Sequence, residues 1–179
     1  MEMLAVIFII SLLSTLLIAN YRRSQKQYAL EQAAQKLVSD LRRVQAMAMS
    51  GEGIAGQYDG YGIYLKRNAT DYIIYGDWDG KDCLYDKTGT NRDTKIETIN
   101  FPANIQAKTI SPLLAGIDVA ANQKNTLHVC FVPPNPILYI NREKEQQILS
   151  EAAITLQYGD DNSLIRTITI TKAGAVKAE

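Results

Sequence analysis

Four aspartates lie close together near the middle of the chain. They are Asp77, Asp79, Asp82 and Asp86. Carboxylate oxygens are the ligands that Ca²⁺ prefers, so this cluster is a candidate Ca²⁺ site. Its spacing, D-x-D-G-x-D, lacks the glycine at the sixth position of an EF-hand loop. The spacing therefore favours an acidic turn exposed to solvent, with Ca²⁺ binding as the alternative, and the sequence indicates no other cofactor.

The chain has two cysteines, Cys83 beside the aspartates and Cys130 in an apolar stretch. If this part of the protein lies outside the cytoplasm, the two could form a disulfide that ties the acidic loop to a strand. Two free thiols are an equal alternative, because the sequence does not give the distance between the two Cα atoms. The single histidine, His128, has no nucleophile at a triad-like spacing, so we expect a structural role for it on a strand.

Neither motifs nor overall charge predict catalysis or nucleic-acid binding. The sequence has no HExxH, paired CxxC, P-loop or GxSxG motif, so we expect no enzymatic activity. It has 19 basic and 19 acidic residues, and this balance gives no general attraction for DNA. Arg166, Lys172 and Lys177 could make a weak DNA contact, but scattered surface charges are the favoured interpretation because no stacking aromatic residues lie near them.

The chain begins with an acidic residue in front of a long apolar run. Glu2 is followed by 17 residues, 3–19, without charge, glycine or proline. As a helix this run would measure about 25 Å, slightly less than the hydrocarbon core of a membrane. The acidic start and the missing cleavage site argue against a signal peptide. The run is predicted to be an anchor, in which Glu2 either lies passively among lipid headgroups or has a use for its charge.

An amphipathic helix is predicted directly after the apolar run. Residues 21–50 contain no glycine or proline, and Gly51 and Gly53 supply the end. Apolar residues recur at steps of three and four, which places them on one face. This stripe consists of Leu30, Ala34, Leu37, Leu41, Val44 and Ala48. Together with the apolar run, it predicts one rod of about 50 residues, roughly 75 Å long.

Alternating apolar residues after Gly53 predict β-strands. Segments 61–66 and 71–75 are expected to form a hairpin, followed by a long surface loop at 76–93. Further strands are predicted at 94–101, 126–132, 136–140, 152–158 and 164–171. We therefore expect an α+β fold, with one long helix packed through its stripe on an antiparallel β-sheet. The predicted divisions are the hydrophobic half of the helix at 1–20, its amphipathic half at 21–52, and the sheet domain at 53–179.

Two stretches of the sequence resemble a known family. Residues 2–10, EMLAVIFII, look like the beginning of the conserved helix of type IV pilins and pseudopilins. Residues 33–48, AAQKLVSDLRRVQAMA, are similar to the second half of that helix in the H-type minor pseudopilins and related minor pilins. Weaker similarity to the Asp- and Gly-rich loop and the closing strand of this group is found at 76–82, GDWDGKD, and 166–176, RTITITKAGAV.

The resemblance implies a structural function. It implies a minor pilin or pseudopilin of a type IV pilus or a type II secretion-like filament, active in filament assembly or priming. The chain would lie in the bacterial inner membrane with a single span and its sheet domain outside the cytoplasm. The implied partners are other pilins, bound through the N-terminal helix, the inner-membrane assembly platform and the prepilin peptidase. The alternative is a membrane-anchored envelope module that binds DNA, Ca²⁺ or a secreted protein.

The resemblance also implies a use for Glu2. The matching glutamate of the family is thought to neutralise the N-terminal ammonium of a neighbouring subunit in the filament core. An unpaired buried carboxylate costs several kcal/mol, which gives this pairing its physical reason. Family precursors carry a basic leader, a glycine and a few further residues before this glutamate. Those residues do not precede Glu2 here. We expect the coding start to lie further upstream; a trimmed chain and a paralogue that is not processed are the alternatives.

Overall fold

The computed structural model describes most of the chain. The described residues are 2–50, 58–78, 83–86, 93–114, 117–118, 125–133, 137–140, 151–171 and 173–178. Asp79, Asp82 and Lys172, which the sequence singles out, lie outside the described residues. Glu2 is described through its backbone only.

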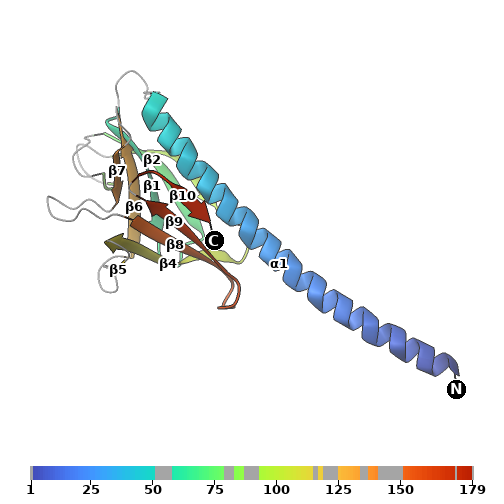
Figure 1. Cartoon of the computed structure of the whole chain (residues 1–179). Helices are drawn as coiled ribbons and strands as arrows, with labels where there is room; N and C mark the ends of the chain where they lie inside the picture. Colours follow the sequence, from blue (N-terminus) through green and yellow to red (C-terminus); the bar gives the residue numbers. More distant parts are fainter. Residues whose placement is uncertain are drawn as a thin grey trace.

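A single uninterrupted helix forms the first quarter of the chain. Helix α1 spans Glu2–Ser50, 49 residues, which corresponds to about 74 Å. The predicted rod is thus confirmed. Figure 1 shows the N-terminal half of α1 projecting away from the strands, whereas its C-terminal half lies along them. The amphipathic half packs on strands of both sheets described next, namely β1, β6, β8, β9 and β10.

Ten strands in the described part of the chain form two antiparallel sheets. Their bounds are β1 Gly60–Lys66, β2 Asp71–Asp77, β3 Thr94–Asn100, β4 Ile105–Leu114, β5 Ile117–Asp118, β6 Thr126–Val132, β7 Ile137–Ile140, β8 Glu151–Tyr158, β9 Ile165–Thr171 and β10 Val176–Ala178. The first sheet has the order β3-β2-β1-β6-β7, and the second sheet has the order β10-β9-β8-β4-β5. The predicted α+β fold, a long helix packed on antiparallel strands, is confirmed. The strands are divided between two sheets, where the sequence predicted one.

Strand β4 is the main element that the sequence did not predict. Its pairing with β8 shifts between Ala107 and Thr109, which marks a bulge. The bulge puts Ile105, Ala107 and Ile110 into the core, so the apolar spacing along the strand is two and then three. Pro112, also inside the strand, further weakens the strand signal. An alternating pattern therefore cannot be recognised in this segment.

The bulge in β4 is also where the two sheets are joined. The backbone N–H of Asn68, in the β1–β2 turn, donates to the carbonyl of Ala107 at 2.8 Å. In return, the N–H of Ala107 donates to the carbonyl of Ala69 at 3.0 Å. Asn68 has φ 57°, a left-handed conformation that asparagine tolerates better than most residues. The hairpin turn of the first sheet is thereby fixed to the second sheet.

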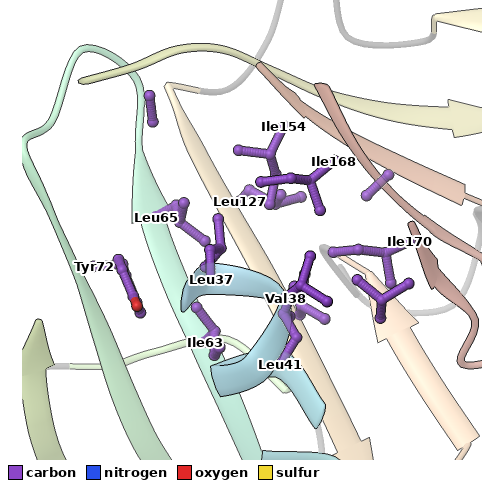
Figure 2. Packing of buried hydrophobic residues seen from close by; sticks show 14 of the residues in the cluster. Leu37, Val38, Leu41, Ile63, Leu65, Tyr72, Leu127, Ile154, Ile168 and Ile170 are labelled. Carbon is purple, nitrogen blue, oxygen red and sulfur yellow. The ribbon is translucent and has the colours of Figure 1, made fainter. Parts of the chain in front are cut away.

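One hydrophobic core lies between α1 and the inner faces of both sheets. Leu37, Val38 and Leu41 of the helix point at Leu127 of the first sheet and Ile168 of the second (Figure 2). All six residues of the predicted apolar stripe are at most 1% exposed. The stripe is therefore confirmed as the face through which the helix covers the sheets.

Candidate interaction surface and thiol cluster

The N-terminal half of α1 exposes a long apolar surface, called the apolar segment below. Its large side chains are between 50% and 79% exposed: Met3, Leu4, Val6, Ile7, Phe8, Ile9, Ile10, Leu12, Leu13 and Ile18. Full burial of one such side chain is worth about 1.5–3 kcal/mol, so the segment has a strong tendency to bind another apolar surface. Exposed apolar surfaces of this extent mark sites of protein or membrane contact.

Two of the three hydroxyl groups within the apolar segment, those of Ser11 and Thr15, do not interrupt its apolar character. Ser11 donates its hydroxyl hydrogen to the carbonyl of Ile7 at 2.8 Å, and Thr15 donates to the carbonyl of Ser11 at 2.8 Å. Both hydroxyls are thus paired within the helix, so a partner surface need not hydrogen-bond them. Glu2 begins the helix, and its predicted pairing role stays a prediction.

The length and apolar character of α1 also bear on whether it could cross a membrane. Over the residues that the structure describes, no helix is both long enough and apolar enough to cross a membrane.

A second candidate site lies on the outer face of the first sheet, opposite the core. There the ligand atoms of Asp77, Cys83 and Cys130 all lie within 4.8 Å of one another, and we call these three residues the thiol cluster. Asp77 comes from β2 and Cys130 from β6, while Cys83 belongs to the segment 83–86 that covers this face. All three residues are at most 1% exposed. The cluster is therefore assembled from three separate parts of the chain.

Two glycines of β1 make room for the thiol cluster. Gly62 pairs with Tyr75 of β2 on one side and with Cys130 of β6 on the other. A Cβ atom at Gly62 would lie 2.6 Å from the Tyr75 hydroxyl oxygen, and one at Gly60 would lie 3.2 Å from Cys130 Sγ. Because β1 runs between β2 and β6, these missing side chains leave the space that Tyr75 and the Cys130 thiol occupy.

Polar contacts hold the covering segment, residues 83–86, against the sheet. The Tyr75 hydroxyl donates to the carbonyl of Cys83 at 2.9 Å, and the Tyr85 N–H donates to His128 Nδ1 at 2.8 Å. The rings of Tyr64 and His128 are 4.9 Å apart, and those of Tyr75 and Tyr85 are 5.1 Å apart. Cys83 has φ 51°, uncommon for a residue other than glycine. His128 lies on a strand as predicted, where it receives this hydrogen bond.

The surroundings of the thiol cluster favour the protonated form of Cys130. Burial raises the pKa of the Cys130 thiol well above its ordinary value. The hydrogen bond to Cys83 and the nearby Asp77 carboxylate raise that pKa further. Burial likewise raises the pKa of the Tyr75 hydroxyl. Without a compensating cation, burial and the neighbouring Asp77 carboxylate disfavour a thiolate at Cys130.

The structure places the predicted cysteine pair side by side. Cys83 and Cys130 are free thiols, both buried, and they are hydrogen-bonded through their side chains. Both alternatives that the sequence left open, a disulfide and two free thiols, stay predictions. Their proximity could not be foreseen, because it depends on how segment 83–86 folds back over β6.

The acidic cluster is arranged differently from the prediction. The sequence predicted Asp77 in a solvent-exposed loop, but β2 extends through it, and it is completely buried. It groups with the two cysteines, and this group does not include Asp86. The N–H of Asp86 donates to Asp93 Oδ2 at 2.8 Å. Because Asp79 and Asp82 lie outside the described residues, the four-residue Ca²⁺ site stays a prediction.

Among the candidate DNA-binding residues, Arg166 is occupied by contacts within the chain. Its Nε donates to Glu31 Oε2 at 2.8 Å, and its Nη1 donates to the carbonyl of Ile165 at 3.1 Å. Lys177 is exposed on β10, and Lys172 lies outside the described residues. The ion pair with Glu31 reduces the positive charge that Arg166 could offer to a phosphate. The DNA contact stays a prediction.

The sequence did not single out Gly60, Gly62 or Tyr75. A signal was nevertheless present, since Gly60 and Gly62 alternate with Tyr61 and Ile63 and must therefore share one face of β1. Two glycines on one face of a strand indicate a close approach by other atoms.

Comparisons with known proteins give two similar structures. No described protein family matches the sequence, and neither does any curated protein. A crystal structure of the type IV minor pilin FimU from Pseudomonas aeruginosa, in space group P21, has a TM-score of 0.45 and 14% identity, covering 84% of this chain and 87% of FimU. A second FimU structure, in space group P65, has a TM-score of 0.44 and 13% identity over 84% of this chain and 92% of FimU. These values describe a likeness and assign no function.

Proposed function

We propose that this chain is a minor pilin-like or pseudopilin-like subunit of a filament of the type IV pilus or type II secretion kind. In this proposal the apolar segment packs among the helices of neighbouring subunits, and the two sheets are displayed on the outside. The observation that carries the proposal is the continuity of α1, whose exposed apolar half runs without interruption into a half that is locked into the core.

The division of α1 fits such a subunit physically. The apolar segment is too extensive to stay in water, so it needs a partner surface. The Leu30–Ala48 stripe is already buried by the chain's own sheets, so it is not offered to a partner. A neighbouring helix would therefore bind the first half alone, and the sheet domain would follow rigidly.

The finer assignments rest on the sequence resemblance. We infer from it that the chain is of the H-type minor group, acts in filament assembly or priming, and starts from the inner membrane with its sheet domain outside the cytoplasm. Its partners would be other pilins, the assembly platform and the prepilin peptidase. Glu2 would pair with the N-terminal ammonium of a neighbouring subunit, because such a pairing removes the cost of burying the carboxylate.

Co-assembly tests the proposal directly. The full chain is produced together with a major pilin and its assembly machinery, filaments are sheared from the cells, and the sheared fraction is probed for the chain. We expect the wild-type chain in this fraction and the Glu2→Ala variant only in the cell-bound fraction. Glu31→Ala is the matched control, since Glu31 is a partly exposed carboxylate on the same helix, ion-paired with Arg166 and hydrogen-bonded by Gln35.

The outcomes separate the two parts of the proposal. Absence of the wild-type chain from sheared filaments would refute the filament function. Normal recovery of Glu2→Ala in filaments would refute the role of Glu2. A second variant, Ile10→Asn, places an amide in the apolar segment, and we expect it to reduce recovery although its sheet domain remains folded.

A further inference from the structure

We propose that Asp77, Cys83 and Cys130 form a binding site for a thiophilic divalent cation of the Zn²⁺ type. The site is independent of the proposed filament function, because it lies on the outer face of the first sheet and uses no residue of α1.

The arrangement of the three ligand atoms suits such a cation. Zn²⁺ binds thiolates at about 2.3 Å and carboxylates at about 2.1 Å in a tetrahedral geometry, which sets its ligand atoms roughly 3.6–3.8 Å apart. In the thiol cluster these atoms all lie within 4.8 Å of one another, so a small adjustment would bring them onto one ion. The cluster provides three protein ligands and leaves a fourth tetrahedral position for water.

The kind of ligand selects the kind of cation. Two sulfur ligands favour Zn²⁺ and similar soft ions, whereas Ca²⁺ and Mg²⁺ require oxygen ligands. The sequence makes the acidic loop a candidate Ca²⁺ site, but in the structure Asp77 lies beside the two thiols. A soft cation therefore fits this site better than a hard one.

Charge gives a second reason. The cluster gathers an acidic side chain and two thiols in a place where all three are shielded from water. On binding, Zn²⁺ would place two positive charges beside the Asp77 carboxylate and displace both thiol protons to solvent, so the total charge of the cluster would not change. The gain is local: the ion attracts its three anionic ligands, and burial away from water strengthens that attraction. A disulfide between the same cysteines would place no positive charge beside Asp77.

The surrounding residues hold the ligands in advance. The Tyr75 hydroxyl fixes the carbonyl of Cys83, and the left-handed backbone at Cys83 fixes the direction of its side chain. Gly60 leaves the space next to Cys130 Sγ. Hydrogen bonds behind the ligands are typical of metal sites and strengthen binding. A bound ion would attach the covering segment 83–86 to strands β2 and β6.

The experiment uses the reduced, metal-free full chain in detergent, with Co²⁺ as a spectroscopic probe and Zn²⁺ as competitor. We expect one Co²⁺ per chain, a thiolate-to-cobalt charge-transfer band, and loss of the band on addition of Zn²⁺. Cys83→Ser and Cys130→Ser should each weaken or abolish the band. Asp77→Asn should weaken the affinity for Co²⁺ by at least roughly 10-fold. Loss of a residue that only hydrogen-bonds a metal ligand already costs about that much, and Asp77 is proposed to bind the ion directly. Asp86→Asn is the matched control and should bind Co²⁺ like the wild type.

Substitution at buried positions can also disturb folding, so the fold of each variant is checked by circular dichroism. The Co²⁺ absorption spectrum of the wild type decides whether the site exists. Failure of the reduced, folded wild type to bind Co²⁺ or Zn²⁺ would overturn the inference. A bound ion without thiolate bands would do the same. Thiols are also counted in protein taken directly from cells and denatured under acid. If this protein contains a Cys83–Cys130 disulfide and no metal, the cysteines form a structural disulfide, and the metal site is refuted.

Discussion

The hydroxyl of Tyr72 on β2 donates a hydrogen bond to Asp40 Oδ2 on α1 at 2.5 Å, across the boundary between helix and sheet. Both residues are at most 2% exposed. The other carboxylate oxygen of Asp40 accepts from Lys36 Nζ at 2.8 Å, one turn earlier on the helix. The helix is thus joined to the first sheet by a directional polar contact in addition to apolar packing, which fixes its rotation about its own axis.

Replacing Tyr72 by phenylalanine should therefore be costly. A buried hydrogen bond to a charged group is worth about 1.5–3 kcal/mol, so we expect Tyr72→Phe to lower the free energy of unfolding by that amount. Urea denaturation of the full chain in mild detergent measures it. Lys36→Ala is the control and should cost at most about 1 kcal/mol, because Lys36 is largely exposed. Equal losses in the two variants would contradict the importance of the buried hydrogen bond.

The same residue makes a prediction for alkaline pH. Burial and the hydrogen bond to Asp40 raise the pKa of the Tyr72 hydroxyl above its ordinary value of 10.0. The stability contributed by the neutral hydroxyl is then complete below pH 10.0 and is lost progressively above it. We expect the wild type to lose more stability than Tyr72→Phe between neutral pH and about pH 11, measured by urea denaturation.

The apolar stripe of α1 can be tested with a cavity-forming substitution. Leu37 is completely buried at the centre of the core. Leu37→Ala should lower the free energy of unfolding by about 2–5 kcal/mol through lost apolar contact and the cavity left behind. Arg42→Ala, on the exposed side of the same helix, should change it by no more than about 0.5 kcal/mol. A small effect of Leu37→Ala would mean that α1 does not pack on the sheets as described.

Gly62 should not tolerate even a methyl group. The added Cβ would lie 2.6 Å from the hydroxyl oxygen of Tyr75, which is buried and hydrogen-bonded to Cys83. We expect Gly62→Ala to lower the free energy of unfolding by about 1–3 kcal/mol. In a Tyr75→Ala background the ring is gone, so the same change at Gly62 should cost much less. An unchanged cost in both backgrounds would rule out the steric explanation.

The raised pKa of Asp93 predicts that the free energy of unfolding declines as the pH rises. Its carboxylate accepts hydrogen bonds from the N–H of Trp78 at 3.2 Å and of Asp86 at 2.8 Å. Burial nevertheless raises the pKa of Asp93 to about 6, from an ordinary value of 3.8. The folded state binds this proton more tightly than the unfolded state does. The contribution of the protonated carboxyl is therefore complete below pH 3.8 and is lost as the pH rises through about 6.

Asp93→Asn, which cannot ionise, should lack this decline. Urea denaturation of wild type and variant across the range from about pH 4 to about pH 7 measures the difference. Asp161→Asn is the control. Asp161 is exposed, and hydrogen bonds from Ser163 lower its pKa, so its contribution to stability is lost as the pH falls, opposite in direction to that of Asp93. A parallel decline in wild type and Asp93→Asn would assign the effect to another group.

The regular parts of this fold could be predicted because each carries its own periodicity. The Leu30–Ala48 stripe has helical spacing, and β6 was predicted with its exact bounds because apolar residues fill it. β4 was missed because its bulge and Pro112 break the alternation. The separation into two sheets depends on which distant strands pair, and no local pattern records that.

The candidate sites show the same limit. Cys83 and Cys130 were identified as residues that could act together, but their contact depends on a loop folding over a distant strand. Asp77 was assigned to a loop because it belongs to an Asp- and Gly-rich stretch. Its backbone in fact continues β2, where it pairs with Gly60. Composition predicts the chemistry of such residues better than it predicts their burial.

The unbroken course of α1 also determines a direction in space. In an α-helix each residue turns the chain by about 100° and advances it by about 1.5 Å. The apolar segment and the stripe buried in the core belong to one such helix. The number of residues between them therefore sets the angle about the helix axis at which the sheets lie relative to the apolar segment. One alanine inserted after Arg22 would swing both sheets by about 100° while leaving every core contact intact. A neighbour that binds the N-terminal half would then meet a different side of the domain.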